Sequence, residues 1–156
     1  MLPVLVPLVT GSLLLLSSRL AEGLRRTVGF AATLALLPIA LLLMAQVADG
    51  SHVVYALGAW QPPFGIVLVA DRLSALMLLL TAIVALASQV YAGDGQDTAG
   101  PQFQALFQFQ LLGINGAFLT GDLFNLFVFF EVLLIAFYTL LLHGLGAQRV
   151  GAAVHV

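Results

Sequence analysis

The chain has no cysteine and no lysine among its 156 residues, and only 8% of its residues are charged. Without cysteine it can supply neither a disulfide framework, nor a zinc–thiolate site, nor the ligands of an iron–sulfur cluster. The net charge is −2, so the sequence also lacks the basic face that nucleic-acid binding requires. We expect no cofactor and no metal site in this chain.

Charge is scarce because apolar residues make up 62% of the chain, with a mean hydropathy of +1.11. Soluble domains are usually about 45–50% apolar and about 25% charged. A composition this apolar excludes a soluble enzyme and an intrinsically disordered segment. The sequence therefore predicts a protein that is solvated by lipid.

Apolar stretches long enough to cross a bilayer occur five times. About 20 helical residues cross a hydrocarbon core of about 30 Å. The first stretch lacks the positive start of a signal peptide, so we expect it to be retained as a helix. These stretches predict an all-α polytopic membrane protein, with residues 1–156 as a single membrane domain. They are Met1–Ser18, Thr27–Ala48, Leu73–Gly93, Thr98–Gly121 and Leu123–His143.

A sixth charge-free stretch, Gly50–Ala70, carries Pro62 and Pro63 in its middle. A proline inside a helix costs about 3 kcal/mol, which argues against a spanning helix here. Val53–Trp60 and Phe64–Ala70 are rich in β-branched and aromatic residues and predict a β-hairpin. An open two-stranded ribbon cannot span lipid, so we expect the hairpin to lie outside the membrane against the helix ends.

The arginines predict the orientation in the membrane. If the chain crosses the membrane five times, four arginines lie on one side of the membrane and Arg72 lies on the other. The four are Arg19, Arg25, Arg26 and Arg149. The positive-inside rule makes the four-arginine side cytoplasmic. The N-terminus and the hairpin are then external, the loop between the first two helices is cytoplasmic, and the protein lies in the cell membrane.

Glu131 is the one charged residue inside the fifth stretch, about eight residues after its start. A charge at the centre of a spanning helix costs about 2.5–3.5 kcal/mol on insertion scales, and such residues usually mark ion or proton pathways. Burial disfavours a charged carboxylate and a nearby cation favours it, so this group can load and release a proton. The five helices supply no buried cation, and the partner must come from elsewhere. The alternative is a neutral Glu131 that only hydrogen-bonds a neighbouring helix.

Gln104, Gln108 and Asn115 fall at i, i+4 and i+11, which places them on one face of the fourth helix. A polar stripe in lipid needs water or another polar surface. It either lines a hydrated pathway from the cytoplasm towards Glu131, or it makes interhelical hydrogen bonds worth about 0.6–2 kcal/mol each.

Other polar residues lie near helix ends. Asn125 is a candidate for the polar interior, and His143 either shuttles protons or is a tolerated interfacial residue. Asp71 is expected to cap the third helix, and Asp122 is a cap or a surface group.

The segment FQFQLLGINGAFLTGDLFNLFVFFEVLLIAFYTLLLHG, residues Phe107–Gly144, resembles the antiporter-like membrane subunits. So does the hairpin that runs into VADRLSALMLLLTA. These subunits are shared by Mrp-type Na+/H+ antiporters and by respiratory complex I, and the segment is most similar to the D subunits of the Mrp-type antiporters. The resemblance covers essentially the whole chain but only about the first third of the family's length. It implies an incomplete membrane domain, the N-terminal part of a longer antiporter-like subunit.

The family implies about fourteen helices in two inverted bundles, within a hetero-oligomeric complex. In the family a glutamate on the fifth helix pairs with a lysine on a later helix, and changes in that pair drive proton movement. By motif Glu131 is the matching glutamate. The matching lysine positions would lie beyond Val156.

Three functional hypotheses follow. The first is a membrane subunit of a monovalent cation/proton antiporter that exchanges H+ for Na+ through Glu131, and is not an enzyme. The second is a proton-pumping membrane subunit of NADH:quinone oxidoreductase, which differs in being driven by NADH. The third is a truncated fragment that does not transport, in which Gln108→Leu or Asn115→Leu would have no transport phenotype.

Overall fold

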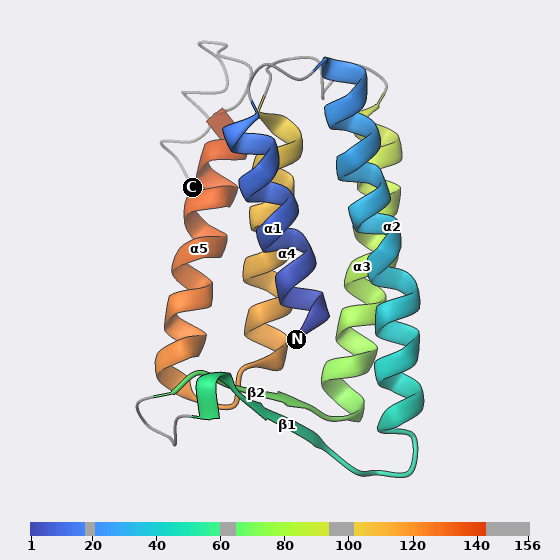
Figure 1. The fold of residues 1–156 in the computed structure, drawn as a ribbon, viewed down its shortest axis with the longest axis vertical. Helices are drawn as coiled ribbons and strands as arrows, with labels where there is room; N and C mark the ends of the chain where they lie inside the picture. Colours follow the sequence, from blue (N-terminus) through green and yellow to red (C-terminus); the bar gives the residue numbers. More distant parts are fainter. Residues whose placement is uncertain (18–20, 60–64, 94–101, 143–156) are drawn as a thin grey trace.

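A computed structural model describes residues 1–17, 21–59, 65–93 and 102–142. In these ranges the chain forms five helices and one antiparallel hairpin (Figure 1). The all-α membrane architecture with a hairpin between the second and third helices is therefore confirmed. The elements are α1 (Leu2–Leu16), α2 (Glu22–Gln46), β1 (Val53–Ala56), the 3-10 turn η1 (Leu57–Ala59), β2 (Val67–Ala70), α3 (Arg72–Ala92), α4 (Phe103–Leu119) and α5 (Leu123–Leu142).

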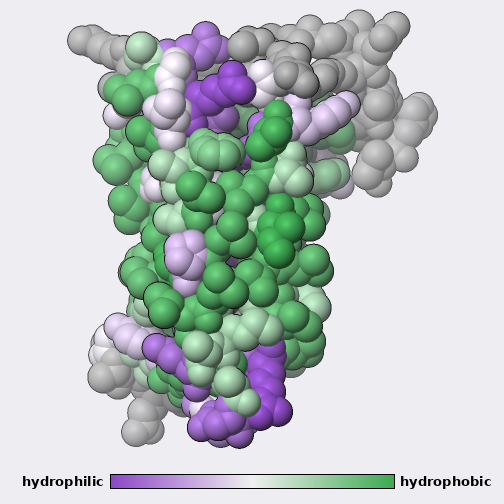
Figure 2. All heavy atoms as spheres, turned by 90° about the vertical axis from the view of Figure 1, so that its right-hand side faces the viewer, coloured by the Kyte–Doolittle hydropathy of each residue, from purple (hydrophilic) through white to green (hydrophobic). Residues whose placement is uncertain are grey.

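The helices run side by side in alternating directions, and the hairpin crosses one end of the bundle (Figure 1). Three of the described helices, α2, α3 and α5, are long and apolar enough to cross a membrane. With 15 and 17 residues, α1 and α4 extend about 23 and 26 Å, less than a hydrocarbon core of about 30 Å. Figure 2 shows a broad apolar band between two hydrophilic ends, as expected for a multi-pass membrane protein.

The second helix begins earlier than the sequence predicts. We expected a start at Thr27, but α2 begins at Glu22 and includes a charged first turn. Arg25 is only 5% exposed, and its Nη2 donates to the carbonyl oxygen of Leu14 at 3.1 Å. The helix can therefore hold an arginine because its guanidinium pairs with one of the free carbonyls at the C-terminal end of α1. A search for charge-free stretches could not detect this pairing, and the expectation that the five helices supply no buried cation was wrong.

Two other arginines also lie at helix C-terminal ends. Arg26 lies against Gly93, which follows the last residue of α3. At the opposite end of the bundle Arg72 donates to the carbonyls of Val47 at 3.3 Å and Ala48 at 2.7 Å, just after α2. A cation at a helix C-terminus is favoured by the helix dipole and by the unpaired carbonyls there. These arginines therefore fasten each helix end to its neighbour.

The hairpin is shorter than predicted, and its two strands have different surroundings. Val53 pairs with Ala70 and Ala56 with Val67, while all of β1 is exposed and most of β2 is buried. The Gly121 amide donates to the Val67 carbonyl at 2.8 Å, which ties β2 to the turn between α4 and α5. The turn expected at Pro62 and Pro63 lies outside the described residues, as do Arg19, Arg149 and His143.

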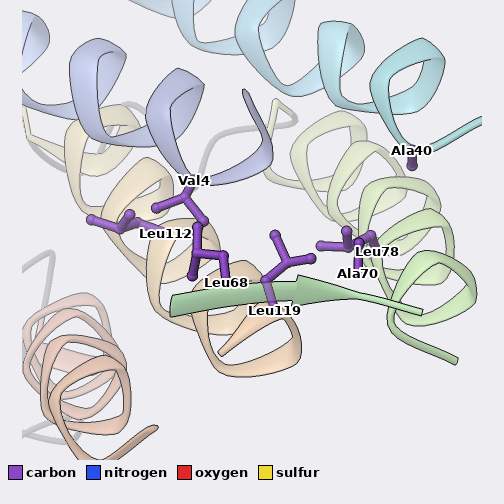
Figure 3. Close-up of a cluster of buried hydrophobic side chains, with 7 residues drawn as sticks. All are labelled: Val4, Ala40, Leu68, Ala70, Leu78, Leu112 and Leu119. Carbon is purple, nitrogen blue, oxygen red and sulfur yellow. The ribbon is translucent and has the colours of Figure 1, made fainter. Parts of the chain in front are cut away.

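Two apolar clusters fill the interior. The first joins β2 to α1, α2, α3 and α4 (Figure 3), so the hairpin packs against the bundle at that end. It comprises Val4, Ala40, Leu68, Ala70, Leu78, Leu112 and Leu119. The second lies between α2, α3 and α4, and comprises Leu36, Ala82, Ala85 and Leu111.

Close packing holds α5 against α4. A Cβ atom on Gly113 would lie 2.8 Å from the backbone nitrogen of Leu133, and one on Gly116 would overlap the ring of Phe129. Two glycines one turn apart thus let the helix backbones approach, as is common in membrane helix pairs. Helix α5 packs mainly against α4. The described residues therefore leave most of the remaining surface of α5 exposed.

The Gly113→Ala variant tests this packing. The added methyl group would meet the Leu133 backbone, which cannot rotate away, and overpacking typically costs about 1–3 kcal/mol. Gly23→Ala is the matched control, since nothing lies within 4 Å of its Cβ position and alanine favours a helix. Unfolding in a sodium dodecyl sulfate titration should occur earlier for Gly113→Ala and no earlier for Gly23→Ala. Equal midpoints for Gly113→Ala and the unmodified chain would contradict the packing.

Asp71 and Asp122 cap helices. The amide of Ser74 donates to Asp71 Oδ1 at 2.7 Å, and the amide of Asn125 donates to Asp122 Oδ1 at 2.8 Å. These backbone hydrogen bonds lower the pKa of both carboxyls. The capping role expected for Asp71 is confirmed, and Asp122 is a cap as well.

The lowered pKa values predict acid sensitivity. Each of these carboxyls has a lower pKa in the folded state than in the unfolded state, where it is about 3.9. Its contribution to the stability of the folded chain is complete above the unfolded pKa, and it is lost as the pH falls through the folded pKa. Unfolding midpoints measured between neutral pH and about pH 2 should therefore fall with acidification. Asp71→Asn keeps a capping oxygen that does not titrate, so this variant should show a smaller fall. An identical pH profile for the two chains would contradict the assignment.

Candidate functional site

Glu131 lies on the side of α5 that faces away from α4. Asn125 and Ala136 are the buried residues of α5, and Phe129 and Leu133 meet the two glycines of α4. At 3.6 residues per turn these four share one face, and Glu131 lies on the opposite face. As the ninth of 20 residues, it is also near the middle of the helix, where the sequence predicted it.

The surroundings of Glu131 on that face are apolar. Phe127 is 63% exposed and Ile135 66%, and Glu131 is exposed between them. Within the described residues the carboxyl of Glu131 has neither a hydrogen bond nor an ion pair. A charged group facing lipid here would cost about 2.5–3.5 kcal/mol. This geometry leaves the carboxyl open to a group from outside the described part of the chain.

The polar stripe of α4 faces α1, α2 and α3 instead. Gln104, Gln108 and Asn115 are 8%, 0% and 2% exposed, so they do lie on one buried face. Gly113 and Gly116, which contact α5, lie on a different face of the same helix. The stripe and Glu131 are therefore not brought together by the described residues.

Gln108 joins α4 to α2. Its Nε2 donates to the Gly29 carbonyl at 2.9 Å and to Thr33 Oγ1 at 3.0 Å. Nearby, Gln89 of α3 donates through Nε2 to Gln104 Oε1 at 3.1 Å. These contacts correspond to the interhelical hydrogen-bonding alternative for the stripe. Sequence analysis missed Thr33 and Gln89 because single polar residues in apolar stretches carry no spacing signal.

Gly29 makes room for this group of amides. A Cβ atom at position 29 would overlap Gln104 Oε1, so a side chain there would displace the glutamine. The hydroxyl of Thr33 also donates to the Gly29 carbonyl, at 3.1 Å. The Gly29 carbonyl thus joins α2 to α4, and α3 is linked to the same group of amides through Gln89 and Gln104.

Asn115 has a separate role that originates in a proline. Pro7 lies inside α1 and has no amide hydrogen, so the carbonyl of Pro3 loses its normal helical donor. Asn115 Nδ2 donates to that carbonyl at 2.9 Å. A proline inside a helix frees the carbonyl four residues earlier, so the sequence signals that the Pro3 carbonyl needs another donor, but it does not identify Asn115 as that donor.

The remaining candidates lie at the ends of α5. Asn125 is 6% exposed, and its side-chain amide donates to Asp122 Oδ2, next to the cap. Its side chain therefore hydrogen-bonds at the first turn of α5, and it does not join the buried amides near Gln108. His143 lies outside the described residues.

A double-mutant cycle tests the contact between Asn115 and Pro3. Asn115→Leu leaves the buried Pro3 carbonyl without its donor and should destabilise the chain by about 1–3 kcal/mol. In a Pro7→Ala background the backbone amide of residue 7 can donate instead, so Asn115→Leu should cost less. The measurement is the unfolding midpoint of the four chains in detergent. Equal costs in the two backgrounds would show that Asn115 does not compensate for the proline.

Curated relatives resemble the chain along nearly its whole length. The D subunit of a probable K(+)/H(+) antiporter of Rhizobium meliloti is 51% identical and is matched over 99% of this chain and 30% of its own length. The D subunit of the Na(+)/H(+) antiporter of Alkalihalophilus pseudofirmus is 42% identical over 92% of this chain and 29% of its own length. The N subunit of the NADH-quinone oxidoreductase of Desulforudis audaxviator is 36% identical over 97% of this chain and 31% of its own length. No family model matches.

Solved structures show the same fold. A chain of an archaeal membrane-bound sulfane sulfur reductase superposes with a TM-score of 0.90 at 28% identity, over 99% of this chain and 32% of that one. A chain of the Mrp complex from Dietzia superposes with a TM-score of 0.83 at 36% identity, over 96% and 29%. The chain spans about 30% of the length of the curated relatives it matches. By sequence and by fold, the chain is therefore similar to about 30% of the length of the D subunits of Mrp-type cation/proton antiporters.

Proposed function

We propose that the chain is part of the membrane subunit of a monovalent cation/proton antiporter and that it exchanges H+ for Na+ through Glu131. The relatives named for this activity support the proposal, one for potassium and another for sodium. The activity would belong to a hetero-oligomeric complex, with other subunits, the bilayer and the transported ions as partners.

The single observation that carries the proposal is the position of Glu131. A carboxyl in the middle of a spanning helix, on a face that is otherwise apolar, is unfavourable against lipid. We therefore place this face of α5 against further protein that supplies a cation to Glu131. Proton binding and release at the carboxyl would then be coupled to movement of that cation or of the transported ion.

The orientation belongs to the same proposal. Figure 1 shows the hairpin and the N-terminus towards one end of the bundle, and Arg25 and Arg26 belong to the start of α2 at the other end. Under the positive-inside rule the arginine end is cytoplasmic and the hairpin end external. The stripe of α4 is not assigned to the ion pathway, because its amides are engaged in hydrogen bonds with α1, α2 and α3.

The second candidate is a proton-pumping subunit of an NADH:quinone oxidoreductase. It is favoured by the 36% identity to a protein named as the N subunit of such a complex. Glu131 would have the same role, but electron transfer elsewhere would supply the energy.

Glu131→Gln is the decisive variant. In vesicles that contain the complete complex, it should reduce sodium-dependent proton movement to background, because the amide cannot bind and release a proton. The amount of assembled complex should stay normal. Asp122→Asn is the matched control, since it removes a carboxyl at the start of the same helix but keeps a capping oxygen. A normal transport rate in Glu131→Gln would exclude this role for Glu131.

The driving force separates the candidates. Proton movement should follow an added gradient of sodium for the antiporter, and potassium measured in parallel tests the cation. Proton movement that requires NADH would favour the oxidoreductase. A complex that moves protons in neither assay would favour the non-transporting fragment.

A further inference from the structure

Four buried polar atoms have no hydrogen-bond partner among the described residues, and one of them, Oδ1 of Asn115, lies about two turns further along α4 than Gln108. The other three are Oε1 of Gln108, Oε1 of Gln89 and Nε of Arg25. Their side chains are 0%, 6% and 5% exposed, so bulk solvent does not reach them. A buried polar group without a partner is unfavourable, and three such groups in one part of the bundle indicate bound molecules that supply the missing hydrogen bonds.

The orientation of the Gln108 amide is determined by its neighbour. The Gly29 carbonyl can only accept hydrogen bonds, so the nitrogen of Gln108 must face it. The side-chain oxygen of Gln108 therefore points away from the Gly29 carbonyl. If the oxygen and the nitrogen of the amide were exchanged, the oxygen would face the Gly29 carbonyl oxygen, and neither of these two acceptors would have a donor.

The three groups belong to one region of the bundle. Arg25, Gly29 and Thr33 follow each other at one-turn spacing on the buried face of α2. The region begins where Arg25 reaches the C-terminal end of α1. One turn beyond Thr33 and Gln108 it meets the apolar cluster that contains Leu36 and Leu111. It is thus polar towards one end of the bundle and closed by apolar side chains at the other.

The ligand must both donate and accept. The two amide oxygens need a donor, whereas Arg25 Nε needs an acceptor. A metal cation would satisfy only the oxygens and would be repelled by the guanidinium, and an anion would satisfy only the guanidinium. Water meets both needs, and buried waters usually make about three hydrogen bonds to otherwise unpaired groups.

We propose that water is bound inside the bundle between α2, α3 and α4, at Gln89, Gln108 and Arg25. It enters from the end where α2 begins, and it stops at the cluster of Leu36 and Leu111. The site lies on a different face of α4 from the one that contacts α5, so it does not depend on the role of Glu131.

X-ray radiolysis of the full chain in lipid nanodiscs tests the proposal. Hydroxyl radicals formed from bound water oxidise side chains within a few ångströms, and peptides are then quantified by mass spectrometry. The chain has no cysteine that would compete for the radicals. Leu36 and Leu111, each 3% exposed, should be oxidised several-fold faster than Leu68, which is 4% exposed and lies in the other cluster.

Two variants sharpen the result. Gln108→Leu removes the fixed acceptor, and the oxidation rates of Leu36 and Leu111 should fall towards that of Leu68. Thr81→Val is the control, because its hydroxyl bonds only to Met77 of its own helix, at 2.8 Å, and these rates should not change.

Several outcomes would overturn the proposal. Equal rates for the three leucines in the unmodified chain would show a dry interior, and this comparison needs no variant. Unchanged rates in a folded Gln108→Leu chain would show that Gln108 does not hold the water. Rates that differ between sodium, potassium and choline chloride would assign the site to a cation.

Discussion

Every backbone polar group inside a lipid-spanning structure needs a hydrogen-bond partner, and side chains supply several of these partners in the described fold. The three arginines contact the ends of α1, α2 and α3, where carbonyls lack helical donors. The carbonyl freed by Pro7 is bound by Asn115. At the other end β2 pairs with β1 and with the turn before α5, so its buried backbone is also satisfied. Polar pairing therefore joins the helices of this chain in addition to the apolar contacts of the two clusters.

Glu131 stands apart from this arrangement. The amides of α4 are directed towards α1, α2 and α3, whereas Glu131 projects from the uncovered face of α5. The amides of α4 thus form an internal polar interface that joins the helices. The carboxyl of Glu131 points outward, and it needs a polar partner from another protein surface. This division explains how a segment with about 30% of its relatives' length can have a coherent interior and still leave its most unusual residue without a partner among the described residues.

Much of this could be predicted from particular residues. The apolar stretches predicted five helices, and Pro62 and Pro63 with their β-branched flanks predicted the hairpin. The early start of α2 was missed because Arg25 is charged, and only its contact with Leu14 makes its burial tolerable. Thr33 and Gln89 were missed because each is a single polar residue, and a hydrogen bond between helices far apart in sequence leaves no periodic pattern.

The sequence by itself determined that lipid surrounds this protein, that it forms five helices in the described residues, and that Glu131 is an unusual charge within one of them. These are properties of composition and of local sequence, which lipid constrains directly. Only the tertiary structure decided which way each polar residue faces. The direction depends on the rotation of each helix about its axis, and packing at Gly113 and Gly116 and the hydrogen bonds to Gly29 and Pro3 determine that rotation. For this reason Gln108 and Glu131, which look alike as intramembrane polar residues, occupy different environments.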